Sequence, residues 1–177
     1  MCRWKGRFDD PQRRYRTLYC ATDAITCFYE VLAPFRPDPT GVEDADAGLV
    51  SQAWRKKHVL VPAQVRLLRG TLVDLGSVAV REQIARRYSS LLSDHGIDHL
   101  DRDAVLGPDR ALTQSLGRLL YEEGAAGVLY ESKLDGICAA LFERRARLVA
   151  TGPGQRLTKP LPELFQACRD LFLSLEP

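Results

Sequence analysis

Apolar residues recur at two different periods along this chain, and that mixture restricts the fold more than any other feature. Helical spacing marks residues 23–33 and 161–175, whereas short apolar runs typical of strands, such as 127–131, stand between the helical segments. The two kinds of segment do not alternate steadily, and neither a GxGxxG nor a GxxxxGK[ST] motif is present. We therefore expect an α+β fold, a single domain over residues 1–177 with a central twisted mixed β-sheet flanked by helices.

The ends of the individual segments follow from residues that interrupt regular structure. Pro34 ends the first helical stripe, Gly124 ends a later one, and Gly70 interrupts an apolar run. Residues 35–50, rich in Pro and small polar residues, indicate a long loop, and 94–103 is polar and irregular. We expect strands at 17–21, 64–75 (one or two) and a hairpin at 127–131 and 136–142, with helices at 23–33, 78–92, 110–123 and 162–175, the last packing on the rest of the domain.

The five cysteines are odd in number and scattered, without a CxxC pair, which argues against a disulfide framework and against a zinc ribbon. Reduced thiols in a cytoplasm are the natural interpretation. The first residues contain no apolar signal-peptide core, and no uncharged apolar run approaches the roughly 18 residues of a membrane span. We expect a cytoplasmic protein with no membrane partner.

Charge is nearly balanced, with 25 Lys and Arg against 23 Asp and Glu, for a net charge of +2. That excess is too small for the broad positive field of non-specific nucleic-acid binding, so no direct nucleic-acid partner is expected. The basic triplets within 13–16, 55–57 and 144–147 are short and are interpreted as solvated faces. His95 and His99 stand four residues apart, but Gly96 and nearby aspartates favour a loop there, and we expect no metal site.

Glu30 lies on the polar side of the first predicted helix. At 100° per residue it is about 150° from the centre of the apolar stripe formed by residues 25, 28, 29 and 32. This angle alone indicates a glutamate that is solvated or that faces a cleft.

Four short strings follow one another in order: Gly-Arg-Phe-Asp at 6–9, Thr-Leu-Tyr-Cys-Ala at 17–21, Tyr-Glu-Val-Leu at 29–32 and Gly-Val-Leu-Tyr-Glu-Ser at 127–132. Together they resemble the RES domain, a family named for an Arg, a Glu and a Ser. Members typically show a Gly-Gly-Arg-Trp/Phe-Asn turn, a Leu-Tyr-Leu-Ala strand, a helix with Glu, and a late Gly-Ile-x-Tyr-x-Ser hairpin. Arg7, Glu30 and Ser132 stand in the three naming positions, and the resemblance extends over about residues 6–142.

The resemblance implies a fold like that of ADP-ribosyltransferase toxins and an activity on NAD as substrate. Family members break the nicotinamide–ribose bond and pass ADP-ribose to water, phosphate or a protein, without a metal. They commonly act as toxins inhibited by an antitoxin with an Xre-type helix-turn-helix domain. An NAD glycohydrolase or phosphorylase, or a mono-ADP-ribosyltransferase, is therefore the implied enzyme.

The resemblance also assigns roles to residues. Glu30 and Arg7 are the implied catalytic residues, and Arg7, Tyr19, Glu30 and Ser132 the NAD-binding ones. A carboxylate beside the ribose stabilises oxocarbenium charge, and a guanidinium on a glycine turn binds a pyrophosphate. Tyr19 offers a flat face to the nicotinamide ring, and Ser132, at the hairpin tip, a polar contact.

Three departures from the family pattern keep an alternative open. A single Gly precedes Arg7, Asp9 replaces the usual Asn, and the chain begins six residues before Arg7, whereas members usually carry an upstream strand with a further Arg. The alternative is an inactive module on the same scaffold that binds NAD or a protein.

Overall fold

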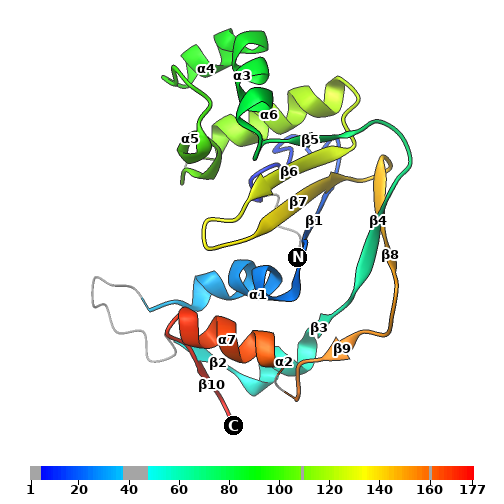
Figure 1. The fold of residues 1–177 in the computed structure, drawn as a ribbon, viewed down its shortest axis with the longest axis vertical. Helices are drawn as coiled ribbons and strands as arrows, with labels where there is room; N and C mark the ends of the chain where they lie inside the picture. Colours follow the sequence, from blue (N-terminus) through cyan, green and yellow to red (C-terminus); the bar gives the residue numbers. More distant parts are fainter. Residues whose placement is uncertain (1–4, 38–47, 109, 160) are drawn as a thin grey trace. The chain divides into compact units, whose positions relative to one another are not determined.

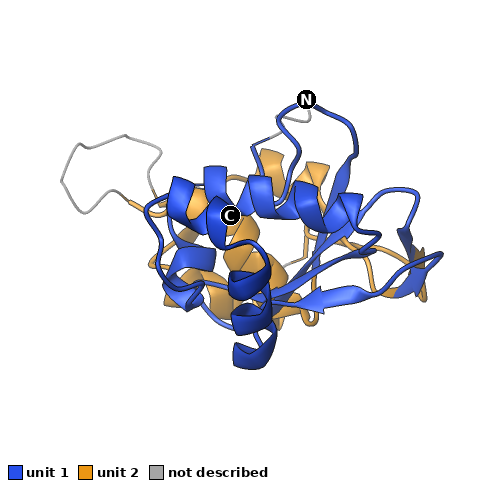
Figure 2. Ribbon diagram, turned by 90° about the horizontal axis from the view of Figure 1, so that it is seen from above, with its two compact units in different colours: residues 1–20, 65–148 blue, residues 21–64, 149–177 orange. Residues whose placement is uncertain are grey.

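The computed structural model describes residues 5–37, 48–108, 110–159 and 161–177. Within this part the chain forms two compact units, residues 1–20 with 65–148 and residues 21–64 with 149–177 (Figure 2). The expectation of a single domain stays a prediction. Helices and strands are mixed in the chain, which confirms the α+β class (Figure 1).

The first unit is built around a mixed sheet of strand order β1-β7-β6-β5. β6 and β7 form the predicted hairpin and pair antiparallel, whereas β5 runs parallel to β6. Gly70, with a φ of 74°, separates β4 from β5, so the apolar run at 64–75 is two strands. The strands of this sheet are β1 (Thr17–Ala21), β5 (Leu72–Asp74), β6 (Gly127–Glu131) and β7 (Ile137–Phe142). A separate two-stranded sheet consists of β4 (Ala63–Leu67) and β8 (Ala146–Ala150), most of whose residues belong to the first unit.

Both faces of β7 are buried, because five of its six residues lie inside the unit. On one face Ala139 and Leu141 pack with Ala126 and Ala146. On the other, the ring of Phe142 contacts Tyr15 edge-on, with ring centroids 4.8 Å apart. Central strands that are covered on both sides read as continuous apolar runs, which is why this hairpin was visible in the sequence.

Helices of the first unit pack beside this sheet. α6 follows the prediction and ends at Glu122, just before Gly124, whose φ of 100° suits glycine. The helix expected at 78–92 is divided at Tyr88, and the segment expected to be irregular from 94 contains the end of α4 and the beginning of α5. The helices are α3 (Val78–Arg87), α4 (Ser89–Asp94), α5 (Arg102–Leu106) and α6 (Ala111–Glu122).

The second unit is centred on α1 (Ala24–Leu32) and α7 (Pro162–Asp170), which pack against each other. Asp23 caps α1, since its Oδ1 accepts a 2.8 Å hydrogen bond from the Thr26 N–H. The short elements are η1 (Ala33–Phe35), β2 (Leu49–Val50), α2 (Gln52–Lys57), β3 (Val59–Leu60), β9 (Gln155–Arg156) and β10 (Ser174–Leu175). The loop expected at 35–50 lies in large part outside the described residues.

The C-terminal helix corrects one prediction. It was expected over 162–175 but ends at Asp170, because Phe172 takes a left-handed φ of 57° and Leu173 donates a 2.7 Å hydrogen bond back to the Cys168 carbonyl. Ser174 and Leu175 then pair with β2 as a parallel strand. The apolar residues beyond the helix end reach the core through this turn and not through a continued helix. Helical periodicity in the sequence does not distinguish the two.

Two of the basic triplets are only partly solvated, contrary to expectation. Arg55 is buried and donates a hydrogen bond to the Glu176 carbonyl. Arg145 is also buried, and its guanidinium lies 3.8 Å from the ring centroid of Tyr121. Among the described residues, Cys20, Cys27, Cys138 and Cys168 form no disulfide, and Cys2 lies outside the described residues.

Candidate functional site

The segment Gly6–Asp9 forms a tight turn that is fastened to β1. Asp9 closes the turn, since its N–H donates to the Gly6 carbonyl at 3.2 Å and its Oδ2 accepts from the Gly6 N–H at 2.7 Å. Tyr19 fastens it, because its hydroxyl accepts a hydrogen bond from the Phe8 N–H at 2.9 Å and donates to Asp9 Oδ1 at 3.1 Å. Asp9 therefore uses both of its carboxylate oxygens as acceptors.

Gly6 makes this arrangement possible. A β-carbon at position 6 would lie 2.4 Å from the hydroxyl oxygen of Tyr19, closer than a β-carbon comes to a non-bonded heavy atom. The Tyr19 phenol thus fills the space that a side chain at position 6 would occupy. Glycine is needed here because it lets the phenol pack directly against the backbone.

The ring of Tyr19 remains partly open although its hydroxyl is enclosed. The side chain keeps 38% of its surface exposed. Burial of the hydroxyl, together with the negative charge of Asp9, raises the pKa of Tyr19 above its usual value, so the group stays protonated. Tyr19 can therefore offer an uncharged aromatic face to a ligand while its hydroxyl holds the turn.

The guanidinium of Arg7 is bound to the C-terminal end of α5. Its Nη1 donates to the carbonyls of Val105 at 2.7 Å and Gly107 at 3.0 Å, and its Nη2 donates to the Leu106 carbonyl at 3.2 Å. The last carbonyls of a helix have no partner within the helix, and Arg7 supplies one. Both terminal nitrogens of Arg7 thus donate hydrogen bonds to backbone carbonyls at the end of α5. The sequence did not suggest this role.

Ser132 lies at the base of the β6–β7 loop and is buried, with 1% of its surface exposed. Its Oγ accepts a 3.1 Å hydrogen bond from the Leu134 N–H, and its own N–H donates to the Gly136 carbonyl at 2.9 Å. The loop spans residues 132–136, one residue longer than expected, because Glu131 and Ile137 are the last paired residues of the hairpin. Ser132 fixes the loop from within instead of standing at its tip.

Arg102 was not identified from the sequence, yet it joins α5 to this hairpin. Its Nε donates to the carboxylate of Glu131, and its Nη2 makes a longer contact of 3.4 Å with the Ser132 carbonyl. α5 is therefore held at its beginning by the hairpin and at its end by Arg7. The one local signal for this helix is Asp101, whose Oδ1 caps it by accepting from the Ala104 N–H at 2.7 Å.

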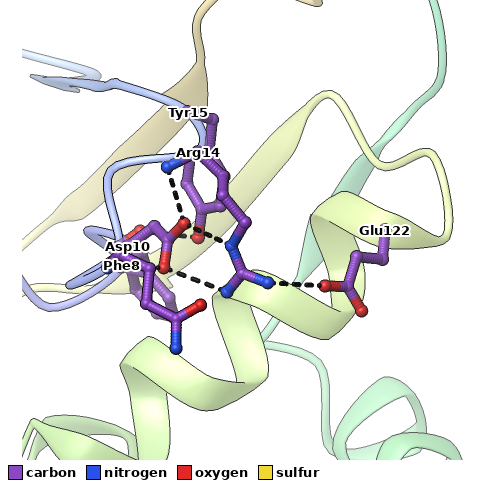
Figure 3. Close-up of polar contacts among 6 residues, drawn as sticks. Phe8, Asp10, Arg14, Tyr15 and Glu122 are labelled. Atoms are coloured by element: carbon purple, nitrogen blue, oxygen red, sulfur yellow. Dashed lines mark hydrogen bonds and ion pairs between the residues drawn. The ribbon is translucent and has the colours of Figure 1, made fainter.

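The backbone that follows the turn is anchored by Asp10, which is almost completely buried. Its carboxylate accepts hydrogen bonds from the Gln12 N–H at 3.1 Å and from the N–H and Nε of Arg14, both at 2.8 Å. Figure 3 shows the Arg14 guanidinium between this carboxylate and that of Glu122, 3.2 Å away on α6. Burial acts to raise the pKa of Asp10, but the hydrogen bonds from Arg14 and Gln12 outweigh it and lower the pKa.

Glu30 belongs to the second unit. It is exposed on α1, opposite the face that buries Phe28, Tyr29 and Leu32, as the helical angle indicated. The helix is held in place by Tyr29, whose hydroxyl donates a 2.7 Å hydrogen bond to Asp170 Oδ2 on α7.

Three of the four expected site residues thus lie in one connected framework. Tyr19 holds the turn that carries Arg7, Arg7 holds the end of α5, and Arg102 joins the beginning of α5 to the Ser132 loop. Glu30 is described within its own unit, and its place in a common site stays a prediction.

Among the described residues, no group of three or more His, Cys, Asp or Glu side chains could hold a metal ion. His95 follows the end of α4 and His99 lies in the coil before α5, so the pair does not share a helix. No helix within the described ranges is long and apolar enough to span a bilayer.

Comparison with known proteins gives one result. The sequence model of the RES domain family matches residues 2–160, which is most of the chain. No curated protein and no solved structure matches it.

Proposed function

Since this chain belongs to the RES domain family, we propose that it cleaves the nicotinamide–ribose bond of NAD. The family is generally associated with NAD-related enzymatic activity, and its members typically pair with antitoxins. We propose accordingly that the protein is a toxin that consumes NAD and that an antitoxin with an Xre-type helix-turn-helix domain inhibits it.

In the proposed reaction the bond between ribose C1′ and the nicotinamide nitrogen breaks, and its electron pair leaves with nicotinamide. The ribose becomes oxocarbenium-like, and water, phosphate or a protein nucleophile attacks C1′ and releases a proton. Glu30 stabilises the positive charge that develops on the ribose and holds its hydroxyls. No metal is needed, because nicotinamide leaves as a neutral molecule.

The remaining residues bind and orient NAD. The ring face of Tyr19 stacks on nicotinamide, since the hydroxyl is already held by the turn. Arg7 attracts the pyrophosphate by its charge from a fixed position, because its terminal nitrogens hold the carbonyls of α5. Ser132 keeps the shape of the neighbouring hairpin loop.

The observation that carries the proposal is the connected framework of Arg7, Tyr19 and Ser132. These residues come from distant parts of the sequence, lie within the range that the RES family model matches and are linked through α5 and the turn. A polar framework that fixes side-chain positions in advance is what a site for a charged substrate requires.

The test is to incubate the purified full-length protein with NAD and to measure released nicotinamide. Glu30→Gln removes the charge with almost no change in shape, and Glu82→Gln makes the same change at an exposed residue of α3. We expect release by the unchanged protein and by Glu82→Gln, and a loss of about 100-fold or more in Glu30→Gln. Equal rates in the two variants would contradict the role of Glu30.

A second candidate is a module on the same scaffold that binds NAD, or a protein, without cleaving it. The engagement of three of the five Arg7 N–H groups with backbone carbonyls favours it, because few donors of this guanidinium remain for a pyrophosphate. This candidate predicts that NAD raises the melting temperature while no nicotinamide is released. No shift with NAD would exclude NAD as its ligand.

A further inference from the structure

Three segments of the first unit meet at the turn between β7 and β8 (Figure 1). The Glu143 N–H donates to the Arg16 carbonyl at 2.8 Å, which places the start of β1 beside the turn. The N–H groups of Leu68 and Arg69 donate to the Arg145 carbonyl at 2.8 and 3.3 Å, which places the end of β4 there as well. The surface at this junction is therefore assembled from residues far apart in the sequence.

Arginine dominates this surface. β4 pairs with β8, and the bond from Leu68 to Arg145 joins the end of β4 to the beginning of β8, so Arg66 and Arg147 lie near the same end of two neighbouring strands. We call the exposed arginines of the three segments the arginine patch: Arg16, Arg66, Arg69, Arg144 and Arg147.

The charge of the patch is not neutralised within the described part of the chain. None of its five side chains makes an ion pair or a side-chain hydrogen bond to the described residues. Two carboxylates on the neighbouring helix α6 and just after it are already paired elsewhere, Glu122 with Arg14 and Glu123 with Arg87. Glu143 is the one acid within the three segments, so the patch carries a local excess of positive charge in a chain whose net charge is only +2.

Apolar side chains interrupt the patch. Leu67 and Leu68, between two patch arginines, are 42% and 51% exposed. No aromatic residue occurs at 66–69 or 143–147, so this surface offers no ring on which a nucleic-acid base could stack. Exposed leucines flanked by arginines are typical of protein interfaces, where an apolar centre has a charged rim.

We propose that the arginine patch docks an acidic segment of a partner protein in which carboxylates alternate with aliphatic side chains. Guanidinium groups pair with carboxylates in bidentate geometry, and the aliphatic groups of the segment cover Leu67 and Leu68. The proposal does not depend on NAD cleavage, because none of the patch residues belongs to the framework of Arg7, Tyr19 and Ser132.

The experiment measures binding of labelled probes to the full-length protein by fluorescence anisotropy. The probes are a 12-residue peptide of alternating Glu and Val, the same peptide with Gln in place of Glu, and a 12-nucleotide oligouridine. The double variant Arg69→Gln/Arg144→Gln removes two patch charges. Its control, Arg86→Gln/Arg156→Gln, removes the same charge from exposed arginines outside the patch.

We expect the Glu-Val peptide to bind more tightly than the Gln-Val peptide and to weaken as salt is added. Its affinity should fall about tenfold in the patch variant and change less than about twofold in the control. Leu68→Ser should also weaken binding of the Glu-Val peptide, since the contact with the leucine side chain is lost. No binding of the Glu-Val peptide, equal losses in the two double variants, or oligouridine binding as tightly as the peptide would each overturn the proposal.

Discussion

The hydroxyl of Tyr19 occupies the space in which a side chain at Gly6 would begin, 2.4 Å from the position of its β-carbon. The Gly-Arg pair at the start of the RES pattern is thereby explained by internal packing, because glycine lets the phenol reach the Phe8 N–H and Asp9. The turn, Arg7 and the aromatic face of Tyr19 then form one assembly.

Gly6→Ala should loosen this assembly. The new methyl group displaces the Tyr19 phenol, so we expect the free energy of unfolding to fall by about 1–3 kcal/mol, the usual cost of overpacking. Urea unfolding measures it. Gly154→Ala is the control, since its β-carbon would meet Val61 at an ordinary 3.4 Å, and it should stay within about 0.5 kcal/mol of the unchanged protein.

Arg7→Lys separates the charge of Arg7 from its shape. An ammonium keeps the positive charge but cannot span the carbonyls of Val105, Leu106 and Gly107, so we expect a loss of about 1–2 kcal/mol in stability. If activity requires that Arg7 holds the end of α5, the rate of nicotinamide release should fall more than tenfold. Retention of full stability in Arg7→Lys would show that these hydrogen bonds do not hold α5, and Arg86→Lys serves as the control for the substitution itself.

Asp10 should make stability depend on acid pH. Its pKa is lower in the folded protein than in the unfolded chain, so its contribution is complete above the unfolded pKa of about 4 and is lost as pH falls through the folded pKa. Asp10→Asn should therefore cost about 2 kcal/mol at pH 7 and much less near pH 2. Urea unfolding at both pH values measures this, and an equal cost at each would contradict it.

Phe172→Gly should stabilise the second unit. Phe172 is 80% exposed and has a φ of 57°, so glycine removes backbone strain while little packing is lost. We expect a gain of about 0.5–1 kcal/mol in the free energy of unfolding. The matched change Phe165→Gly, inside α7, should instead destabilise the protein, and a loss in both variants would show that Phe172 makes a contact that matters.

Elements long enough to show a repeating apolar pattern were predictable from the sequence, whereas short elements were not. α6 and the β6–β7 hairpin appear nearly where expected because each contributes several buried residues at its own period. α5 was missed, since a helix of five residues shows little more than one period and its ends are held by Arg7 and Arg102 from elsewhere in the chain. The end of α7 was misplaced because pairing of β10 with β2 overrides the helical pattern.

The amino-acid sequence alone determined the α+β class, the family pattern and the exposed face of α1 that carries Glu30, because these depend on local period and residue order. Tertiary structure decided that Gly6 makes room for Tyr19, that Arg7 holds α5, that Ser132 is buried and that distant arginines gather beside the β7–β8 turn. Each of these depends on contacts between residues far apart in the chain, and local periodicity carries no information about such contacts.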